Sequence, residues 1–144
     1  MYQERNLNKK VRILIVEDET IIAKCLKMDL ESSGNGYEVV DTITTGEGAI
    51  EYVKKEYYNN NRLDLILTDI GLAGEMSGIQ ATKEILENYK DIKVIYCSAN
   101  INEETKPLIQ KSGAKGALIK PVNKNDLVTA IKQVLAGKET YHFD

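Results

Sequence analysis

The chain has 144 residues, of which 42% are hydrophobic, and this size suits one domain with a single core. Its net charge of -3 leaves no excess positive field for a polyphosphate backbone, so we predict no direct contact with nucleic acid. The apolar runs are too short to span a membrane, and the polar start MYQERNLNKK is unlike a signal peptide, which predicts a cytoplasmic protein.

Short β-rich runs alternate with stretches of helical spacing along the chain. The first run, 11–16 (VRILIV), is followed by apolar residues four apart over 22–30, as on one helix face. The second run, 37–43 (YEVVDTI), alternates so that Asp41 shares a side with apolar residues, which favours an edge strand. Apolar residues at 49–53 then indicate a second helix.

The second half of the chain repeats this alternation. The runs 63–69 (LDLILTD), 92–98 (IKVIYCS) and 116–120 (GALIK) predict three further strands. Apolar residues at helical spacing over 79–86 and 127–135 predict helices after the third and fifth strands, the last with the clearest amphipathic stripe.

The stretch between Ser98 and Gly113 has the weakest pattern. Pro107 fits a helix only near its start, so we expect a short or shifted fourth helix there. Cys25 and Cys97 fall inside apolar patterns without metal-ligand spacing, which predicts core thiols. The chain is expected to comprise a tail at 1–10, one domain at 11–137 and a second tail at 138–144.

Five strands alternating with five helices predict an α/β fold. Right-handed crossovers give a doubly wound, five-stranded parallel sheet with helices on both faces. With 37–43 at an edge, the order 2-1-3-4-5 of flavodoxin-like folds is favoured over a barrel, which needs about 250 residues. Ligands of such sheets bind beyond the carboxyl ends of the strands, here between the first and third.

Each central strand of this sheet is predicted to end on polar side chains. Taken singly, each has an ordinary explanation, such as a helix-dipole contact, a turn former, a loop hydroxyl or a solvated surface charge. Because all of them converge on one edge, their conjunction predicts a site. They are Glu17 and Asp18 after the first strand, Asp69 after the third, Ser98 at the end of the fourth and Lys120 at the end of the fifth.

The residue types at this edge point to phosphoryl chemistry. Three carboxylates repel one another unless a cation joins them, and oxygen ligands without Cys or His suit a hard ion such as Mg2+. A metal with open positions, the ammonium group of Lys120 and the hydroxyl of Ser98 would form a pocket for a phosphoryl group. Asp69 would then be the nucleophile, forming an aspartyl phosphate.

Four motifs, ILIVEDE, LDLILTDIGLAGEMSG, VIYCSAN and GALIKP, resemble those of receiver domains of two-component response regulators over 11–136. The resemblance implies a cytoplasmic phosphorylation-controlled switch that assists its own phosphorylation and slow dephosphorylation but is not an enzyme. A sensor histidine kinase or a histidine phosphotransfer protein would be the donor, and the downstream effector is not identified. The implied roles are Glu17 and Asp18 at Mg2+, Asp69 as phosphoacceptor and metal ligand, Gly71 as a carbonyl ligand, Ser98 as switch hydroxyl, Lys120 at the phosphoryl group, and a cis bond before Pro121.

Two positions depart from the family pattern. Ala117 stands where the family usually has an aromatic residue, and Val122 replaces the commoner phenylalanine after the KP pair. We therefore expect a conformational signal to travel mainly through Ser98 and residues 99–112, and a partner to bind that segment and the last helix. The resemblance also allows a homodimer through the face of the fourth helix, fifth strand and fifth helix.

Three alternatives stay open at this point. A haloacid dehalogenase-type phosphatase also uses a strand-end aspartate and Mg2+, but Gly71 stands where its second aspartate would be. A flavin or nucleotide carrier would need a glycine-rich phosphate loop after the first strand, where this chain has EDET. A degenerate receiver used only for docking would not need the intact set of acids, hydroxyl and lysine.

Overall fold

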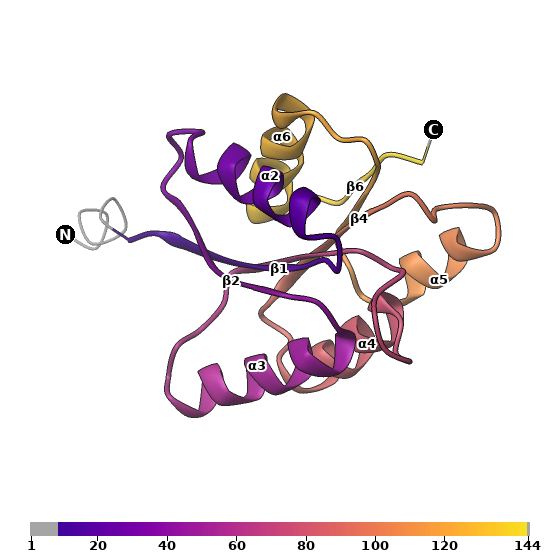
Figure 1. Ribbon diagram of the computed structural model, residues 1–144, viewed down its shortest axis with the longest axis horizontal. Helices are drawn as coiled ribbons and strands as arrows, with labels where there is room; N and C mark the ends of the chain where they lie inside the picture. Colours follow the sequence, from indigo (N-terminus) through magenta and orange to yellow (C-terminus); the bar gives the residue numbers. More distant parts are fainter. Residues whose placement is uncertain (1–8, 144) are drawn as a thin grey trace.

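A computed structural model of the protein describes residues 9–143, so most of the tail predicted at 1–10 lies outside the described residues. Six parallel strands form one sheet in the order β2-β1-β3-β4-β5-β6. Helices cover both faces, as predicted (Figure 1). The strands are β1 (Val11–Val16), β2 (Tyr37–Ile43), β3 (Leu65–Thr68), β4 (Lys93–Ser98), β5 (Gly116–Ile119) and β6 (Thr140–Tyr141), and the helices are α2 (Thr20–Glu31), α3 (Gly46–Tyr58), α4 (Gly78–Asn88), α5 (Thr105–Lys111) and α6 (Lys124–Leu135). Across the described residues, every helix falls short of the length and apolar character that a membrane crossing requires.

The sheet separates two apolar layers. Successive side chains of a strand point to opposite faces, so Ile13 and Ile15 pack with α2 and α6 while Leu14 and Val16 pack with α3 and α4. Tyr96, fully buried, belongs to the second layer, and its hydroxyl donates to Ser112 Oγ at 2.9 Å. The central strands are buried on both sides, which explains their continuous apolar sequence.

Strand β2 lies at the edge, as predicted, but its side assignment is wrong beyond Val39. The pairing register with β1 shifts between Ile13 and Leu14, so that Val39 and Asp41 take adjacent partners and Val40 is skipped. This irregularity reverses the alternation, as a bulge does. Val39 packs on the α2 and α6 side, whereas Val40 packs in the opposite layer and Asp41 is exposed.

The sheet has one strand more than predicted, because β6 forms within the segment expected to be a tail. Thr140 N donates to Lys115 O at 2.9 Å, and His142 N donates to Ala117 O at 2.8 Å. A strand of 2 residues is too short to show an alternating pattern, so sequence periodicity could not reveal it.

Two further expectations concern α5 and the cysteines. Helix α5 is short, at 7 residues, and Pro107 lies in its first turn, as predicted.

Cys97 is buried, whereas the prediction that Cys25 is a core thiol is wrong, because Cys25 is exposed. The buried stripe of α2 consists of Ala23, Leu26 and Leu30, and Cys25 lies on a different side of the helix.

Candidate functional site

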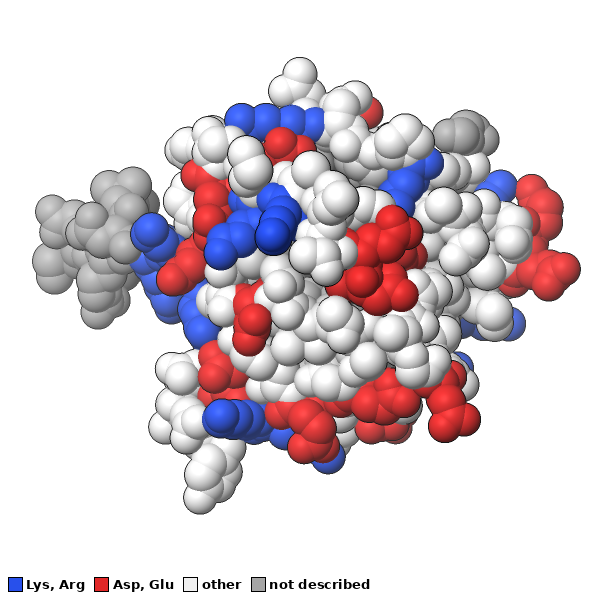
Figure 2. Space-filling view, viewed as in Figure 1, with Lys and Arg blue, Asp and Glu red and all other residues white. Residues whose placement is uncertain are grey.

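The predicted polar side chains meet at the carboxyl end of the sheet. Glu17 and Asp69 follow β1 and β3 directly, Ser98 ends β4, and Lys120 follows β5. Figure 2 shows acidic side chains gathered around this end of the sheet, to the right of centre. The topology therefore joins residues that lie 103 positions apart in the chain.

Lys120 bridges the two buried carboxylates of the site. Its Nζ lies 2.5 Å from Glu17 Oε1 and 2.8 Å from Asp69 Oδ2. The sequence predicts a cation between these carboxylates. The ammonium of Lys120 supplies part of that positive charge. The side chains are only 2% exposed for Glu17 and 9% for Asp69, so little water screens the pairs.

The backbone holds Asp69 in a fixed place. Its N–H donates to Val16 O at 2.9 Å, which extends the pairing of β3 with β1. Ile70 N donates to Asp69 Oδ1 at 2.7 Å, while Thr68 Oγ1 donates to the Asp69 carbonyl at 2.8 Å. With one carboxylate oxygen bonded to the backbone and the other to Lys120, the side chain is oriented before any ligand arrives.

Burial and ion pairing act in opposite directions on the pKa values here. Burial raises the pKa of the Glu17 carboxyl above its ordinary value, although the hydrogen bonds from Lys120 and Glu19 work against the shift. Burial also works to lower the pKa of Lys120, but hydrogen bonds to Asp69 and Glu17 outweigh it, so the pKa is raised. The side chain of Lys120 is therefore protonated and positively charged at neutral pH.

A third carboxylate completes an acidic cluster. Glu17, Asp18 and Asp69 each offer one oxygen, and these atoms all lie within 4.8 Å of one another. Asp18 is exposed, so the cluster opens toward solvent on its side. Three carboxylates against one ammonium leave net negative charge, and an all-oxygen donor set fits a hard divalent cation such as Mg2+.

The remaining predicted residues surround this cluster. Ser98 is fully buried, and its Oγ accepts from Asn100 N at 3.1 Å. Gly71 is exposed, and a Cβ added there would lie 2.8 Å from Asn100 Nδ2, so glycine allows that side chain to approach. The peptide bond before Pro121 is cis, as the resemblance implied.

Gly78 is a residue of the site that the sequence reasoning missed. A Cβ at Gly78 would lie 1.9 Å from the carbonyl oxygen of Asp69, so only glycine lets α4 start against the end of β3. Gly78 N donates to Ile70 O at 2.7 Å, and Ser77 and Gln80 cap the helix reciprocally. The Ser-x-x-Gln spacing was readable as a helix start and would have drawn attention to the glycine inside it.

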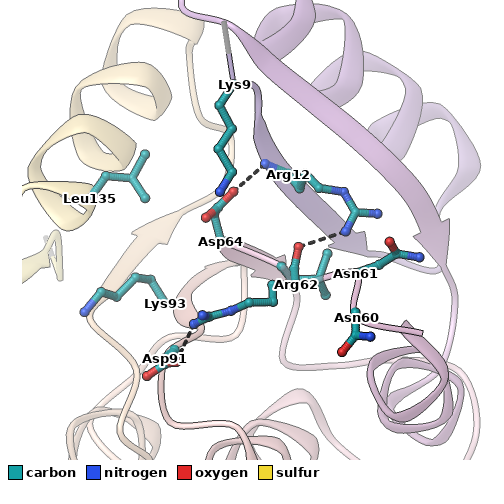
Figure 3. A pocket seen from close by; sticks show the side chains of 10 residues that line it. Lys9, Arg12, Asn60, Asn61, Arg62, Asp64, Asp91, Lys93 and Leu135 are labelled. Carbon is teal, nitrogen blue, oxygen red and sulfur yellow. Dashed lines mark hydrogen bonds and ion pairs between the residues drawn. The ribbon is translucent and has the colours of Figure 1, made fainter. Parts of the chain in front are cut away.

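The structure also has a cavity of about 610 Å³ at the other end of the sheet. Figure 3 shows its charged lining, in which Arg12 N donates to Asp64 and Arg62 pairs with Asp91. These groups lie at the amino ends of β1, β3 and β4 and do not reach Asp69. This cavity is therefore separate from the candidate site.

A doubly wound parallel sheet with an acid pair, a strand-end aspartate, a buried serine and a lysine defines a response regulator receiver domain. The chain belongs to this family, whose pattern it matches over residues 13–132. Membership sets aside the haloacid dehalogenase and flavin-carrier alternatives. Receiver domains are in general non-enzymatic signalling switches in which an aspartate is phosphorylated and an acidic pocket binds Mg2+.

Relatives cover the chain to different extents. It is 32% identical to the transcriptional regulatory protein DegU of Brevibacillus brevis over 99% of this chain, but spans only 57% of that protein. It is 35% identical to the chemotaxis protein CheY of Treponema pallidum, covering 86% of this chain and 82% of that one. A chain of the CheX-CheY-BeF3-Mg+2 complex of Borrelia burgdorferi superposes with a TM-score of 0.80 at 28% identity, covering 90% of this chain and 92% of that chain.

Proposed function

We propose that this chain is a cytoplasmic phosphorylation-controlled switch that accepts a phosphoryl group on Asp69 from a histidine kinase or a histidine phosphotransfer protein. The observation that carries the proposal is the Lys120 bridge between Asp69 and Glu17, because it orients a nucleophile beside a fixed positive charge. The chain would be a substrate that assists its own chemistry, not an enzyme. We also propose that these residues make no direct contact with nucleic acid, because the net charge of the chain is -3.

The chemistry follows from the contacts of Asp69. One carboxylate oxygen attacks the phosphorus of a phosphohistidine, forming an O–P bond as the P–N bond breaks, and the donor imidazole takes up a proton and leaves neutral. Lys120 Nζ, 2.8 Å from Asp69 Oδ2, offsets the added negative charge. Ser98 Oγ would donate a hydrogen bond to a phosphoryl oxygen. Slow attack by water on the acyl phosphate restores Asp69.

Glu17, Asp18, Asp69 and the carbonyl of Gly71 would hold Mg2+. The bound ion supplies charge that offsets the repulsion between the carboxylates and the incoming phosphoryl oxygens. The support from the chain itself is the cluster of three carboxylates within 4.8 Å, which Lys120 neutralises only in part.

A groove beside the site supports a protein donor. It has a volume of about 450 Å³, runs between α2 and the loop after β5, and includes Ile21, Cys25, Lys120 and Val122 in its lining. Ile21 is 77% exposed, which gives a partner an apolar contact next to Lys120. A donor protein has to dock on this edge of the sheet to bring its phosphohistidine to Asp69.

The decisive experiment supplies Mg2+ and acetyl phosphate and locates the acyl phosphate by mass spectrometry after borohydride trapping. We expect one labelled residue, Asp69, no labelling of Asp69→Asn, and unchanged labelling of the control Asp64→Asn at the opposite end of the sheet. Labelling that persists at another residue in Asp69→Asn contradicts the assignment. Full labelling in the presence of a chelator contradicts the metal requirement.

A second experiment separates the donor groove from the chemistry. Ile21→Ala should slow phosphoryl transfer from a phosphorylated histidine phosphotransfer protein while leaving labelling by acetyl phosphate unchanged. Met28→Ala is the matched control, because Met28 is 69% exposed on the same helix and does not line the groove. Equal slowing with both donors would place Ile21 in the site itself, and no slowing with either would remove the groove from the proposal.

A further inference from the structure

The segment 138–143, called here the C-terminal strap, crosses the free edge of β5. Gly137, with a φ of +93°, turns the chain after α6 and directs it back along the sheet. Tyr141 pairs in register with Ala117, and its hydroxyl donates to Ala114 O at 2.7 Å. The amide of Thr140 donates to Lys115 O, directly before β5, and the amide of His142 donates to Ala117 O within β5. The strap thus closes an edge that would otherwise be open.

The strap is attached to α5 as well as to β5. The Tyr141 ring stacks on Phe143 with centroids 5.5 Å apart, and Lys106 Nζ lies 5.4 Å from the Phe143 centroid. Both aromatic side chains pack against the layer that contains Ile109 of α5 and Ala117 of β5. The strap thus contacts both the helix and the strand, and these contacts hold the two elements in their present relative position.

Gly116 shows that the β5 edge is shaped for the strap. A Cβ at Gly116 would lie 2.8 Å from Thr140 O and 3.0 Å from Thr140 Cγ2. Neither distance is available to a real side chain without moving the strap. Its nearest other neighbour, Ile95 Cγ1, is at 3.4 Å, so the crowding falls mainly on the strap.

A chain of contacts joins the strap to Ser98. Ser98 Oγ accepts from Asn100 N at 3.1 Å, and Asn100 O accepts from Thr105 Oγ1 at 3.1 Å. Thr105 is the first residue of α5, and Lys106, which follows it, lies over the Phe143 ring. The Ser98 hydroxyl would turn toward a phosphoryl group on Asp69. Phosphorylation would therefore disturb the hydrogen bond between Ser98 and Asn100, which is the first in this chain of contacts.

We propose that the C-terminal strap is a self-inhibitory element that is docked on β5 and α5 in the unphosphorylated chain and released when Asp69 carries a phosphoryl group. This inference rests on the proposed function. The docked strap stabilises the present arrangement of Ser98 and Asn100, and a ligand that changes this arrangement must work against it. Coupling between two sites is reciprocal, so loosening the strap strengthens phosphoryl binding by the factor with which phosphoryl binding weakens the strap.

The first test measures amide hydrogen exchange of the full chain with and without Mg2+ and beryllofluoride, which mimics a phosphoryl group on a carboxylate. Exchange at the Thr140 and His142 amides should accelerate by about fivefold or more on binding, while the Val11 amide, bonded to Gly36 O at the opposite edge of the sheet, should not change. Unchanged or slower exchange at Thr140 and His142 in the bound chain overturns the inference.

The second test measures beryllofluoride affinity by calorimetry. Gly116→Ala and Phe143→Ala should each bind more tightly, by about fivefold or more in the stronger case, and Tyr58→Ala is the control because Tyr58 is 88% exposed and remote from the strap. Unchanged or weaker binding in both strap variants contradicts the coupling. If beryllofluoride does not bind the unaltered chain at all, the proposed function fails first, an outcome distinct from binding that leaves the strap in place.

Discussion

The two ends of the sheet both carry clusters of opposite charges, but they differ in burial and in balance. At the amino end, Arg12 Nη2 bonds Glu56 Oε1 at 2.9 Å. Arg62 pairs with Asp91, and Lys9 and Lys93 line the same cavity as Asp64 (Figure 3). At the carboxyl end, the ammonium of Lys120 pairs with two carboxylates, those of Glu17 and Asp69, and the Asp18 carboxylate adds a third negative charge to the cluster.

This difference shows that clustering of charge does not by itself make a site. The Arg62 and Asp91 side chains are 65% and 71% exposed, so water already solvates them and their pairing contributes little. Glu17 and Asp69 are nearly buried and only partly neutralised, which leaves them in need of a further cation.

The largest effect is expected from removing Lys120, compared with removing a lysine at the amino end of the sheet. Lys120→Met leaves two buried carboxylates without their partner and should lower the free energy of unfolding by about 3 kcal/mol without Mg2+. Lys93→Met, at the amino end, should change it by about 0.5 kcal/mol or less. Urea denaturation measures both, and equal losses would show that burial does not distinguish the two ends.

Removing the exposed acid of the cluster should act mainly on metal binding. Asp18→Ala should weaken Mg2+ binding about tenfold or more, and it should slightly raise stability in metal-free protein by relieving repulsion. Asp64→Ala at the other end should leave Mg2+ affinity unchanged. Calorimetric titration with Mg2+ tests both variants, and normal affinity in Asp18→Ala would mean that the metal lies elsewhere.

The raised pKa of Glu17 predicts a pH dependence of stability in metal-free protein. Because burial raises this pKa above the ordinary 4.5, the folded chain binds the proton more tightly than the unfolded chain does. Stability should therefore fall as pH rises from 4.5 through the folded pKa and then level off. Urea denaturation of Glu17→Gln should show a shallower fall over this window, and an unaltered slope would assign the dependence to another group.

The smallest effect is expected at the exposed pair of the amino end. A double-mutant cycle on Arg62→Ala and Asp91→Ala should give a coupling energy of about 0–1 kcal/mol that disappears in high salt. A coupling as large as the cost of Lys120→Met would contradict the contrast between the ends.

Much of the fold could be predicted because local signals agreed with one another. Continuous apolar runs marked β1, β3 and β4, and the mixed run 37–43 marked the edge. The site followed from topology, since parallel strands deliver their carboxyl ends to one place. Strand-end position alone therefore groups Glu17, Asp69 and Lys120 into one site.

Other features depended on contacts that no local pattern carries. The role of Gly78 comes from how closely α4 approaches Asp69, and the exposure of Cys25 comes from the direction in which α2 presents its stripe. Val40 is skipped because β1 and β2 pair with an irregular register. Each of these is set by the position of a neighbouring element.

The sequence by itself determined the α/β class, the strand order and the chemical nature of the edge, because hydrophobic periodicity and strand-end residues are local properties. Only the tertiary structure decided that Lys120 joins Glu17 to Asp69, since hydrogen-bond distances are fixed by packing. It also decided that Thr140–Tyr141 closes the β5 edge. A strand so short is stable only where an existing edge offers its donors and acceptors, as Lys115 O and Ala117 O do here.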